Sequence, residues 1–158
     1  RKVGDQYYAM VSPVMIDAKN PLYSVNGVFN AIFIHGNVLG DAMFYGSGAG
    51  KLPTASAVVA DVVDCAKNKG RNIMMSWSEE KLNLLQIDDV KSRFFVRVSG
   101  HAAERQSEIE ELFGKVEIVA VPSLSEEFAF ITGEMTEEEY REKAEKLDGI
   151  QSRIRARI

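Results

Sequence analysis

Three glycines within five positions separate an apolar segment from a run of small residues. Gly46, Gly48 and Gly50 follow the apolar residues 42–45, and Pro53 opens the run that comes next. This pattern predicts a strand that turns through glycines into the N-terminus of a helix. Glycine adopts positive φ and lets a ligand approach the backbone, and a helix start presents free amides. Such a turn suits a phosphate or another anion.

Two familiar phosphate motifs nearly fit this turn, and both fail on spacing. A dinucleotide fingerprint needs Gly-x-Gly-x-x-Gly, but the third glycine falls one place early at Gly50, and Lys51 takes its position. A P-loop needs Lys followed by Ser or Thr, and here Leu52 follows Lys51. Spacing alone therefore favours a tight strand-to-helix turn without a ligand, with an anion site as the alternative.

The amino acids of this region are more specific than their spacing. Two segments, in this order along the chain, closely resemble the end of the catalytic region of homoserine dehydrogenase: Pro21-Leu22-Tyr23-Ser24-Val25-Asn26-Gly27-Val28-Phe29-Asn30-Ala31, and Gly46-Ser47-Gly48-Ala49-Gly50 followed by Pro53-Thr54-Ala55-Ser56-Ala57-Val58-Val59-Ala60-Asp61. The resemblance covers about the first 70 residues. It implies interconversion of aspartate 4-semialdehyde and homoserine with NAD or NADP, on the route to threonine, methionine and isoleucine. It also implies that Gly50 helps seat the cofactor, with Gly48 and Ala49 as neighbours.

The resemblance also implies that much of the enzyme lies elsewhere. The family's N-terminal nucleotide-binding unit has no counterpart in this sequence, nor do its substrate-handling lysine and carboxylates. We therefore expect the C-terminal piece of a longer enzyme, with no catalytic residue of its own and no turnover in isolation. The preference between NAD and NADP stays open.

Composition is typical of a compact cytoplasmic protein. The chain has 158 residues, of which 46% are hydrophobic, with no apolar run near the ~18 residues of a membrane span and no secretory leader. Cys65 is predicted to be a buried thiol, and His35 and His101 have no neighbours at metal-ligand spacing, so no metal site is expected. Residues 92–158 hold ten basic and fourteen acidic residues, which argues against a nucleic-acid partner.

The first part of the chain predicts three strands and a helix. Alternating residues favour strands at about 6–16, 28–35 and 38–45, with a hairpin turn at Gly36-Asn37, and a helix at about 53–67. Five small or branched apolar residues have the spacing of a buried helix face: Val58, Val59, Val62, Val63 and Ala66. In the family the sheet that this helix packs on belongs to the nucleotide-binding unit. We therefore expect the face to be exposed here, or covered by a partner chain.

The second part of the chain has a different order of elements. Strands are predicted at 94–98, 116–121, 127–132 and 150–158, with helices at 102–113 and 136–147; Thr136 and Glu139 form a predicted capping box. The order β-α-β-β-α-β is the split βαβ arrangement of ferredoxin-like folds. The expected class is α+β, with a catalytic-region part at 1–70, a linker at 71–91 and a second domain at 92–158.

The position of this second domain resembles the ACT regulatory domain that many homoserine dehydrogenases carry. ACT domains pair edge to edge and bind an amino acid where the first strand meets the first helix, which here is Ser99, Gly100, His101 and Ala102. The turn keeps a glycine but lacks the Asp-x-Pro-Gly sequence of many members. Two alternatives follow: an effector site for an amino acid such as threonine, or a domain that only joins chains into a homo-oligomer, such as a dimer. A regulatory module without catalysis is the alternative function.

Overall fold

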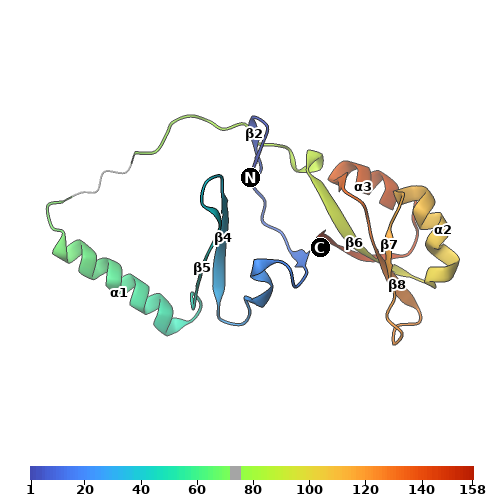
Figure 1. Ribbon diagram of the computed structural model, residues 1–158, viewed down its shortest axis with the longest axis horizontal. Coiled ribbons are helices and arrows are strands. Elements are labelled where there is room, and N and C mark those ends of the chain that lie inside the picture. The colour runs from blue at the N-terminus through green and yellow to red at the C-terminus, as the bar shows by residue number, and fades with distance from the viewer. Residues whose placement is uncertain (72–75) are drawn as a thin grey trace. The chain divides into compact units, whose positions relative to one another are not determined.

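The computed structural model describes residues 1–71 and 76–158, which form two compact units. The sheet unit contains Arg1–Ile16 together with Lys81–Ile158, and the hairpin unit contains Asp17–Glu80. In Figure 1 the main β-sheet and the helices that pack on it belong to the first, and a β-hairpin followed by a long helix belongs to the second. Residues 72–75 of the predicted linker lie outside the described residues.

The sheet unit contains every element predicted after residue 92. Its elements are η2 (Ile87–Asp89), β6 (Lys91–Ser99), α2 (Ala102–Phe113), β7 (Glu117–Val119), β8 (Glu127–Ile131), β9 (Met135–Thr136), α3 (Glu137–Ala144) and β10 (Ile150–Arg157). Four strands lie in the order β10-β6-β8-β7, and each pairs antiparallel with its neighbour. The short β9 pairs with the start of β6. The mixed helix and strand class is confirmed.

The core of this unit lies between the sheet and its two helices. Phe94 of β6 packs against Tyr140 of α3 with ring centroids 4.5 Å apart, and Phe113 of α2 lies 5.2 Å from Phe130 of β8. The cluster of buried side chains consists of Phe94, Val96, Val98, Ile109, Phe113, Phe128, Phe130, Met135, Tyr140 and Leu147. Alternate residues of β6 supply three of them, because successive side chains of a strand point to opposite faces.

Local signals set the limits of the helices in this unit. The Thr136 hydroxyl accepts a hydrogen bond from the Glu139 amide at 3.1 Å, and the Thr136 amide donates to the Glu139 carboxylate at 2.7 Å. This reciprocal pair is the predicted capping box, and it satisfies two amides at the start of α3. Gly114, with φ of +77°, ends α2.

The N-terminal segment differs from its prediction. Instead of one strand over 6–16, the structure has β1 (Lys2–Val3) paired with β2 (Gln6–Tyr7), and a separate β3 (Val14–Ile16). Pro13 lacks an amide hydrogen, and regular pairing begins only after it. The strand β3 then pairs in parallel with β10, and Val14 lies opposite Arg155. Residues 1–16 therefore belong to the sheet unit.

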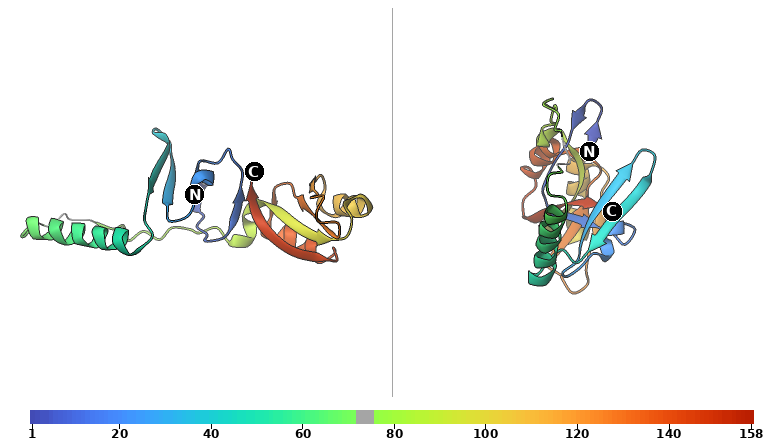
Figure 2. Two further views of the ribbon diagram at one scale, coloured as in Figure 1. Left: turned by 90° about the horizontal axis from the view of Figure 1, so that it is seen from below. Right: turned by 90° about the vertical axis from the view of Figure 1, so that its left-hand side faces the viewer.

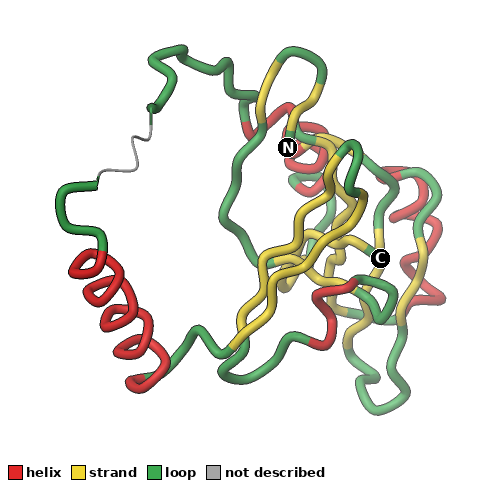
Figure 3. Tube along the Cα trace, turned by 60° about the vertical axis from the view of Figure 1, so that its left-hand side comes forward, coloured by secondary structure: helices red, strands yellow, loops and turns green. Residues whose placement is uncertain are grey.

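The hairpin unit follows its prediction more closely. It consists of η1 (Pro21–Ser24), β4 (Asn30–Gly36), β5 (Gly40–Gly46) and α1 (Lys51–Lys67). The strands β4 and β5 are antiparallel, so the predicted hairpin is confirmed, but Gly36 pairs with Gly40 and the turn lies at 37–39 rather than at Gly36-Asn37. Figure 3 shows the hairpin and α1 as uninterrupted elements. The helix begins at Lys51 rather than Pro53.

The helix α1 buries none of its side chains. Val58, Val59 and Val62 are each about three-fifths exposed, with relative exposures of 58%, 59% and 62%. The expectation that the apolar face of α1 is exposed in this chain is therefore confirmed. The prediction of a buried thiol is wrong, because Cys65 lies on this uncovered helix and is exposed.

The compact units do not coincide with the predicted division at 1–70, 71–91 and 92–158. Residues 1–16 and 81–91 lie with the sheet unit, since β3 pairs with β10, and Tyr7 forms a bridge with Leu84. Figure 2 shows β3 beside β10 in its left view. Among the described residues, no helix has both the length and the apolar character needed to cross a membrane.

Candidate cofactor and effector sites

The glycine turn joins β5 to α1, and its three glycines, Gly46, Gly48 and Gly50, have different environments. The Gly48 amide donates to the Gly46 carbonyl at 3.0 Å, and the Ala49 amide to the Val28 carbonyl at 3.4 Å. Gly50 precedes α1 with φ of +113°, a conformation that L side chains rarely adopt. A Cβ on Gly48 would lie 3.0 Å from the side-chain nitrogen Nδ2 of Asn30. The backbone conformation therefore favours glycine at Gly50, whereas at Gly48 a Cβ would displace only the end of the Asn30 side chain.

The start of α1 has free main-chain amides and no acidic side chain beside them. Thr54 makes the first helical hydrogen bond, from its amide to the Gly50 carbonyl at 3.2 Å, and its hydroxyl donates to the same carbonyl at 2.8 Å. The amides of Lys51 and Leu52 precede that bond, and no acidic side chain lies in the first turn. The positive end of the helix dipole is therefore not neutralised by a neighbouring carboxylate.

The structure brings the three predicted cofactor residues together on this exposed turn. Gly48, Ala49 and Gly50 are contiguous, and all three are exposed. The arrangement can offer main-chain amides to an anionic group, which is the chemistry that nucleotide phosphates require. No catalytic residue was predicted, and within residues 1–71 and 76–158 no group of three His, Cys, Asp or Glu side chains could hold a metal ion.

The predicted effector residues lie together where β6 meets α2. The Ser99 amide donates to the Gly149 carbonyl at 3.0 Å, and the Gly100 amide to the Glu126 carbonyl at 2.9 Å. Gly100 has φ of +103°, and His101 precedes α2 without a side-chain cap. The amides of Ala102 and Ala103 precede the first helical bonds, which Glu104 and Arg105 make to His101.

Arg105, a residue that the sequence patterns did not single out, packs over this turn. Its guanidinium donates to the Ser99 carbonyl at 3.1 Å and pairs with Glu108 at 3.0 Å. A Cβ on Gly100 would lie 3.2 Å from Arg105 Cδ, so the glycine makes room for the arginine stem. The sequence did contain one signal for this contact, a basic residue one turn after the predicted start of the helix.

A second feature unseen in the sequence is a hollow of about 470 Å³ beside the same turn. It is lined by the end of β6, the connection from β7 to β8 and the start of β10: Ser99, Ser123, Leu124, Ser125, Glu126, Glu127 and Gln151. Of the four predicted effector residues only Ser99 lines it. Glu127 is paired with Arg97 at 2.6 Å, whereas Glu126 accepts from Ser125 at 3.2 Å. Six of the seven lining residues have polar side chains, and the seventh is Leu124.

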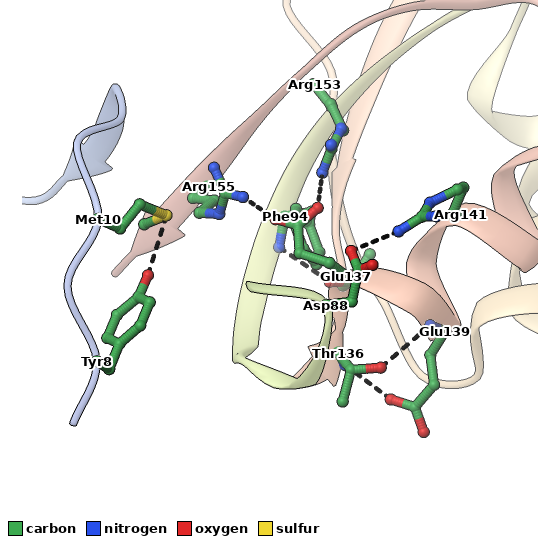
Figure 4. A network of polar contacts seen from close by, with 11 residues as sticks. Tyr8, Met10, Asp88, Phe94, Thr136, Glu137, Glu139, Arg141, Arg153 and Arg155 are labelled. Atoms are coloured by element: carbon green, nitrogen blue, oxygen red, sulfur yellow. Dashed lines mark hydrogen bonds and ion pairs between the residues drawn. The ribbon is translucent and has the colours of Figure 1, made fainter. Parts of the chain in front are cut away.

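Another cluster of charges joins α3 to β10, as Figure 4 shows. Arg153 donates to Glu137 Oε2 at 2.7 Å, and the Arg155 guanidinium contacts Oε1 without hydrogen-bond geometry. The Arg153 guanidinium also lies over the ring of Tyr140, 4.8 Å from its centroid. Burial raises the pKa of the Tyr140 hydroxyl and outweighs the opposing charge of Arg153. Among the described residues this hydroxyl has no hydrogen-bond partner.

Comparison with known proteins places the first part of the chain. Residues 1–63 match the family model for homoserine dehydrogenase. The matched segment includes the glycine turn and ends within α1. Over this part the chain is similar to homoserine dehydrogenases. It is 42% identical over 94 residues to homoserine dehydrogenase from Lactococcus lactis, and 54% identical over 61 residues to that from Corynebacterium glutamicum. These alignments cover 58% and 39% of this chain.

Solved homoserine dehydrogenases also share its fold. The protein from Thiobacillus denitrificans matches 99% of this chain with a TM-score of 0.74 at 24% identity, and the chain covers 40% of that structure. A Staphylococcus aureus homoserine dehydrogenase matches 92% of the chain with a TM-score of 0.62 at 26% identity. The likeness thus extends into the sheet unit, beyond residue 63. The chain spans only 22% of the L. lactis protein.

Proposed function

We propose that this chain is the C-terminal part of a homoserine dehydrogenase that interconverts aspartate 4-semialdehyde and homoserine with NAD or NADP. Two observations support the proposal: residues 1–63 match the family, and the chain covers 22% of the L. lactis homoserine dehydrogenase. The chain alone should be inactive, because the nucleotide-binding unit and the substrate-handling residues that the resemblance implies lie in the rest of the enzyme.

The glycine turn carries this proposal. Gly50 combines a positive φ, an exposed backbone and a helix start without an acidic neighbour. We propose that this turn, with Gly48 and Ala49, offers main-chain contacts to the nicotinamide cofactor held by the preceding part of the polypeptide. A side chain on Gly50 would force the turn out of this conformation and would crowd the approach to its amides.

The uncovered apolar face of α1 agrees with this arrangement. Val58, Val59, Val62 and Val63 have relative exposures between 43% and 62%, and burial of such side chains against a preceding unit would be favourable. A helix exposed in this way is expected where the sheet that covers it belongs to a part of the enzyme outside residues 1–158, or to a partner chain.

The test is to replace Gly50 with Val in the complete enzyme. We expect KM for the cofactor to rise by about ten-fold or more, because loss of one charge-assisted contact costs about 1.5–3 kcal/mol. Gly46→Ala is the matched control, since a Cβ there meets nothing within 4 Å and Gly46 lacks positive φ. Unchanged cofactor kinetics in the Gly50 variant would refute the assignment.

We infer, in addition, that residues 92–158 form a ferredoxin-like ACT domain. The antiparallel order β10-β6-β8-β7, with α2 and α3 contributing to one core, supports this. The domain would pair chains into a dimer and bind an amino acid such as threonine at Ser99, Gly100, His101 and Ala102. The amides at the start of α2 suit the carboxylate of such a ligand.

Calorimetry of the chain with threonine, isoleucine and methionine tests this second role. Saturable heat with one of them, lost in Ala102→Pro, which removes one of the free amides at the start of α2, would support an effector site at the turn. His101→Ala separates backbone from side-chain effects, because it removes the imidazole and keeps the main-chain amides. His35→Pro cannot serve as a control, because His35 lies within β4 and proline would break that strand. No heat and no thermal shift with any of the three would favour a domain that only joins chains.

A further inference from the structure

The outer edge of β10 borders a hollow that the proposed enzymatic and regulatory roles do not use. It has a volume of about 270 Å³ and is lined by Pro13, Arg153, Ile154 and Arg155. Its position follows from the sequence: β3 pairs with β10 only from Val14 onward, and Pro13 has no amide hydrogen to extend the ladder. All four lining residues belong to the sheet unit.

The two arginines at this hollow share a single carboxylate. Arg153 reaches Glu137 Oε2 at 2.7 Å, and the Arg155 guanidinium contacts Oε1 of the same group. The Glu137 side chain is only 7% exposed, so it is committed to these contacts. Two guanidinium charges against one carboxylate leave this trio with one excess positive charge. Each guanidinium has five N–H donors, and one nitrogen of each faces Glu137.

The arginines are held in place before any ligand arrives. Arg153 lies over two aromatic rings, 5.3 Å from the Phe94 centroid and 4.8 Å from the Tyr140 centroid. Arg155 is 18% exposed, and its backbone is paired on both sides, with β3 and with β6. Fixed guanidinium groups lose little conformational entropy on binding, which favours affinity.

We propose that this hollow binds a small oxyanion, a carboxylate or phosphate group, through Arg153 and Arg155. The planar fork of a guanidinium matches two oxygens of either group, and a hydrogen bond between two charged groups is stronger than one between neutral groups. The site is separate from the β6–α2 turn, because none of Ser99, Gly100, His101 and Ala102 lines the hollow.

Titration of the chain with inorganic phosphate, acetate and chloride at matched ionic strength tests the proposal. We expect saturable binding of phosphate or acetate in the millimolar range and no binding of chloride. Comparison of the phosphate titration with the acetate titration distinguishes a phosphate ligand from a carboxylate ligand. Arg153→Lys and Arg155→Lys keep the charge but remove the fork, and each should weaken binding about ten-fold. Arg97→Lys, on the same sheet but paired with Glu127, is the matched control and should bind as the wild type.

Absence of saturable binding by both anions would overturn the proposal, as would equal weakening in the Arg97 variant. Circular dichroism checks that each variant folds. If a lysine variant does not fold, the Nε–H NMR signals of Arg153 and Arg155 in the wild-type chain decide: shifts that saturate with the anion support the site, and their constancy refutes it. These readouts are independent of cofactor kinetics, so failure here leaves the proposed dehydrogenase function untouched.

Discussion

Gly149 lies directly against Ser99 at the point where β10 begins beside the end of β6. The Ser99 amide and hydroxyl both donate to the Gly149 carbonyl, at 3.0 and 3.3 Å. A Cβ built on Gly149 would lie 2.4 Å from Ser99 Oγ, and Gly149 has φ of +78°. This contact lies at the end of the pairing between β6 and β10 and links β10 to the β6–α2 turn, which contains the predicted effector residues.

Gly149→Ala should therefore lower the free energy of unfolding by about 1–3 kcal/mol, since it combines an unfavourable φ with a steric overlap. Denaturant unfolding followed by circular dichroism measures the change. Gly133→Ala is the control, because its Cβ would meet nothing within 4 Å and its φ is not positive. Equal effects of the two substitutions would contradict the role given to the Ser99–Gly149 contact.

Tyr140 should make stability fall at alkaline pH. Burial raises its pKa above 10.0 in the folded state, so folding favours the protonated phenol. The stabilisation is complete below the unfolded value and is lost as pH rises through the folded value. Denaturant unfolding between pH 8 and 12 should show this loss in the wild type, and Tyr140→Phe should lack that part of it.

The same variant has a second expected effect at neutral pH. Tyr140→Phe keeps the ring contacts with Phe94 and removes a buried hydroxyl that has no partner among the described residues. Its free energy of unfolding should stay within about 1 kcal/mol of the wild type or exceed it. A loss of 2 kcal/mol or more at pH 7 would mean that the hydroxyl makes a favourable interaction.

The capping box at the start of α3 should be measurable on its own. Thr136→Ala removes the hydroxyl that accepts from the Glu139 amide and should destabilise the chain by about 1 kcal/mol. Ser107→Ala, at an exposed position within α2, removes a similar hydroxyl and should have little effect. If both variants unfold at the same denaturant concentration as the wild type, the cap contributes nothing.

The exposed face of α1 should tolerate polar residues. Val59→Gln with Val62→Gln should leave the free energy of unfolding within about 0.5 kcal/mol and reduce the fluorescence of a bound hydrophobic dye, because both valines are about three-fifths exposed. Ile109→Ala is the contrast: Ile109 is fully buried, and its truncation should cost about 2–5 kcal/mol. A comparable loss in the valine variant would show that α1 is covered in solution.

Sequence patterns predicted the local features well. The hairpin of β4 and β5, the helix α1 and the capping box at Thr136 all depend on neighbouring residues, and each is present near its predicted position. The positive φ of Gly50 likewise follows from a local need for a sharp turn. Such features are encoded in a few consecutive positions, which is why they could be identified.

Long-range pairings had no comparable signature. The parallel contact of β3 with β10 joins residues 14 and 155, and nothing in either segment specifies the other. Arg105 was missed as a partner of Ser99 for a similar reason, since a basic residue in a helix has many possible partners. The prediction for Cys65 was wrong because helical spacing identifies an apolar face but does not reveal whether a neighbour covers it.

The pairing of β3 with β10 has a consequence for any attempt to dissect this polypeptide. An excision that begins at residue 81 would retain most of the sheet unit but would delete β3, leaving Arg155, Ala156 and Arg157 with an unpaired outer edge. Such an unprotected edge invites pairing with other chains. Self-association of that truncated piece would then reflect the missing strand, rather than the way the whole polypeptide assembles.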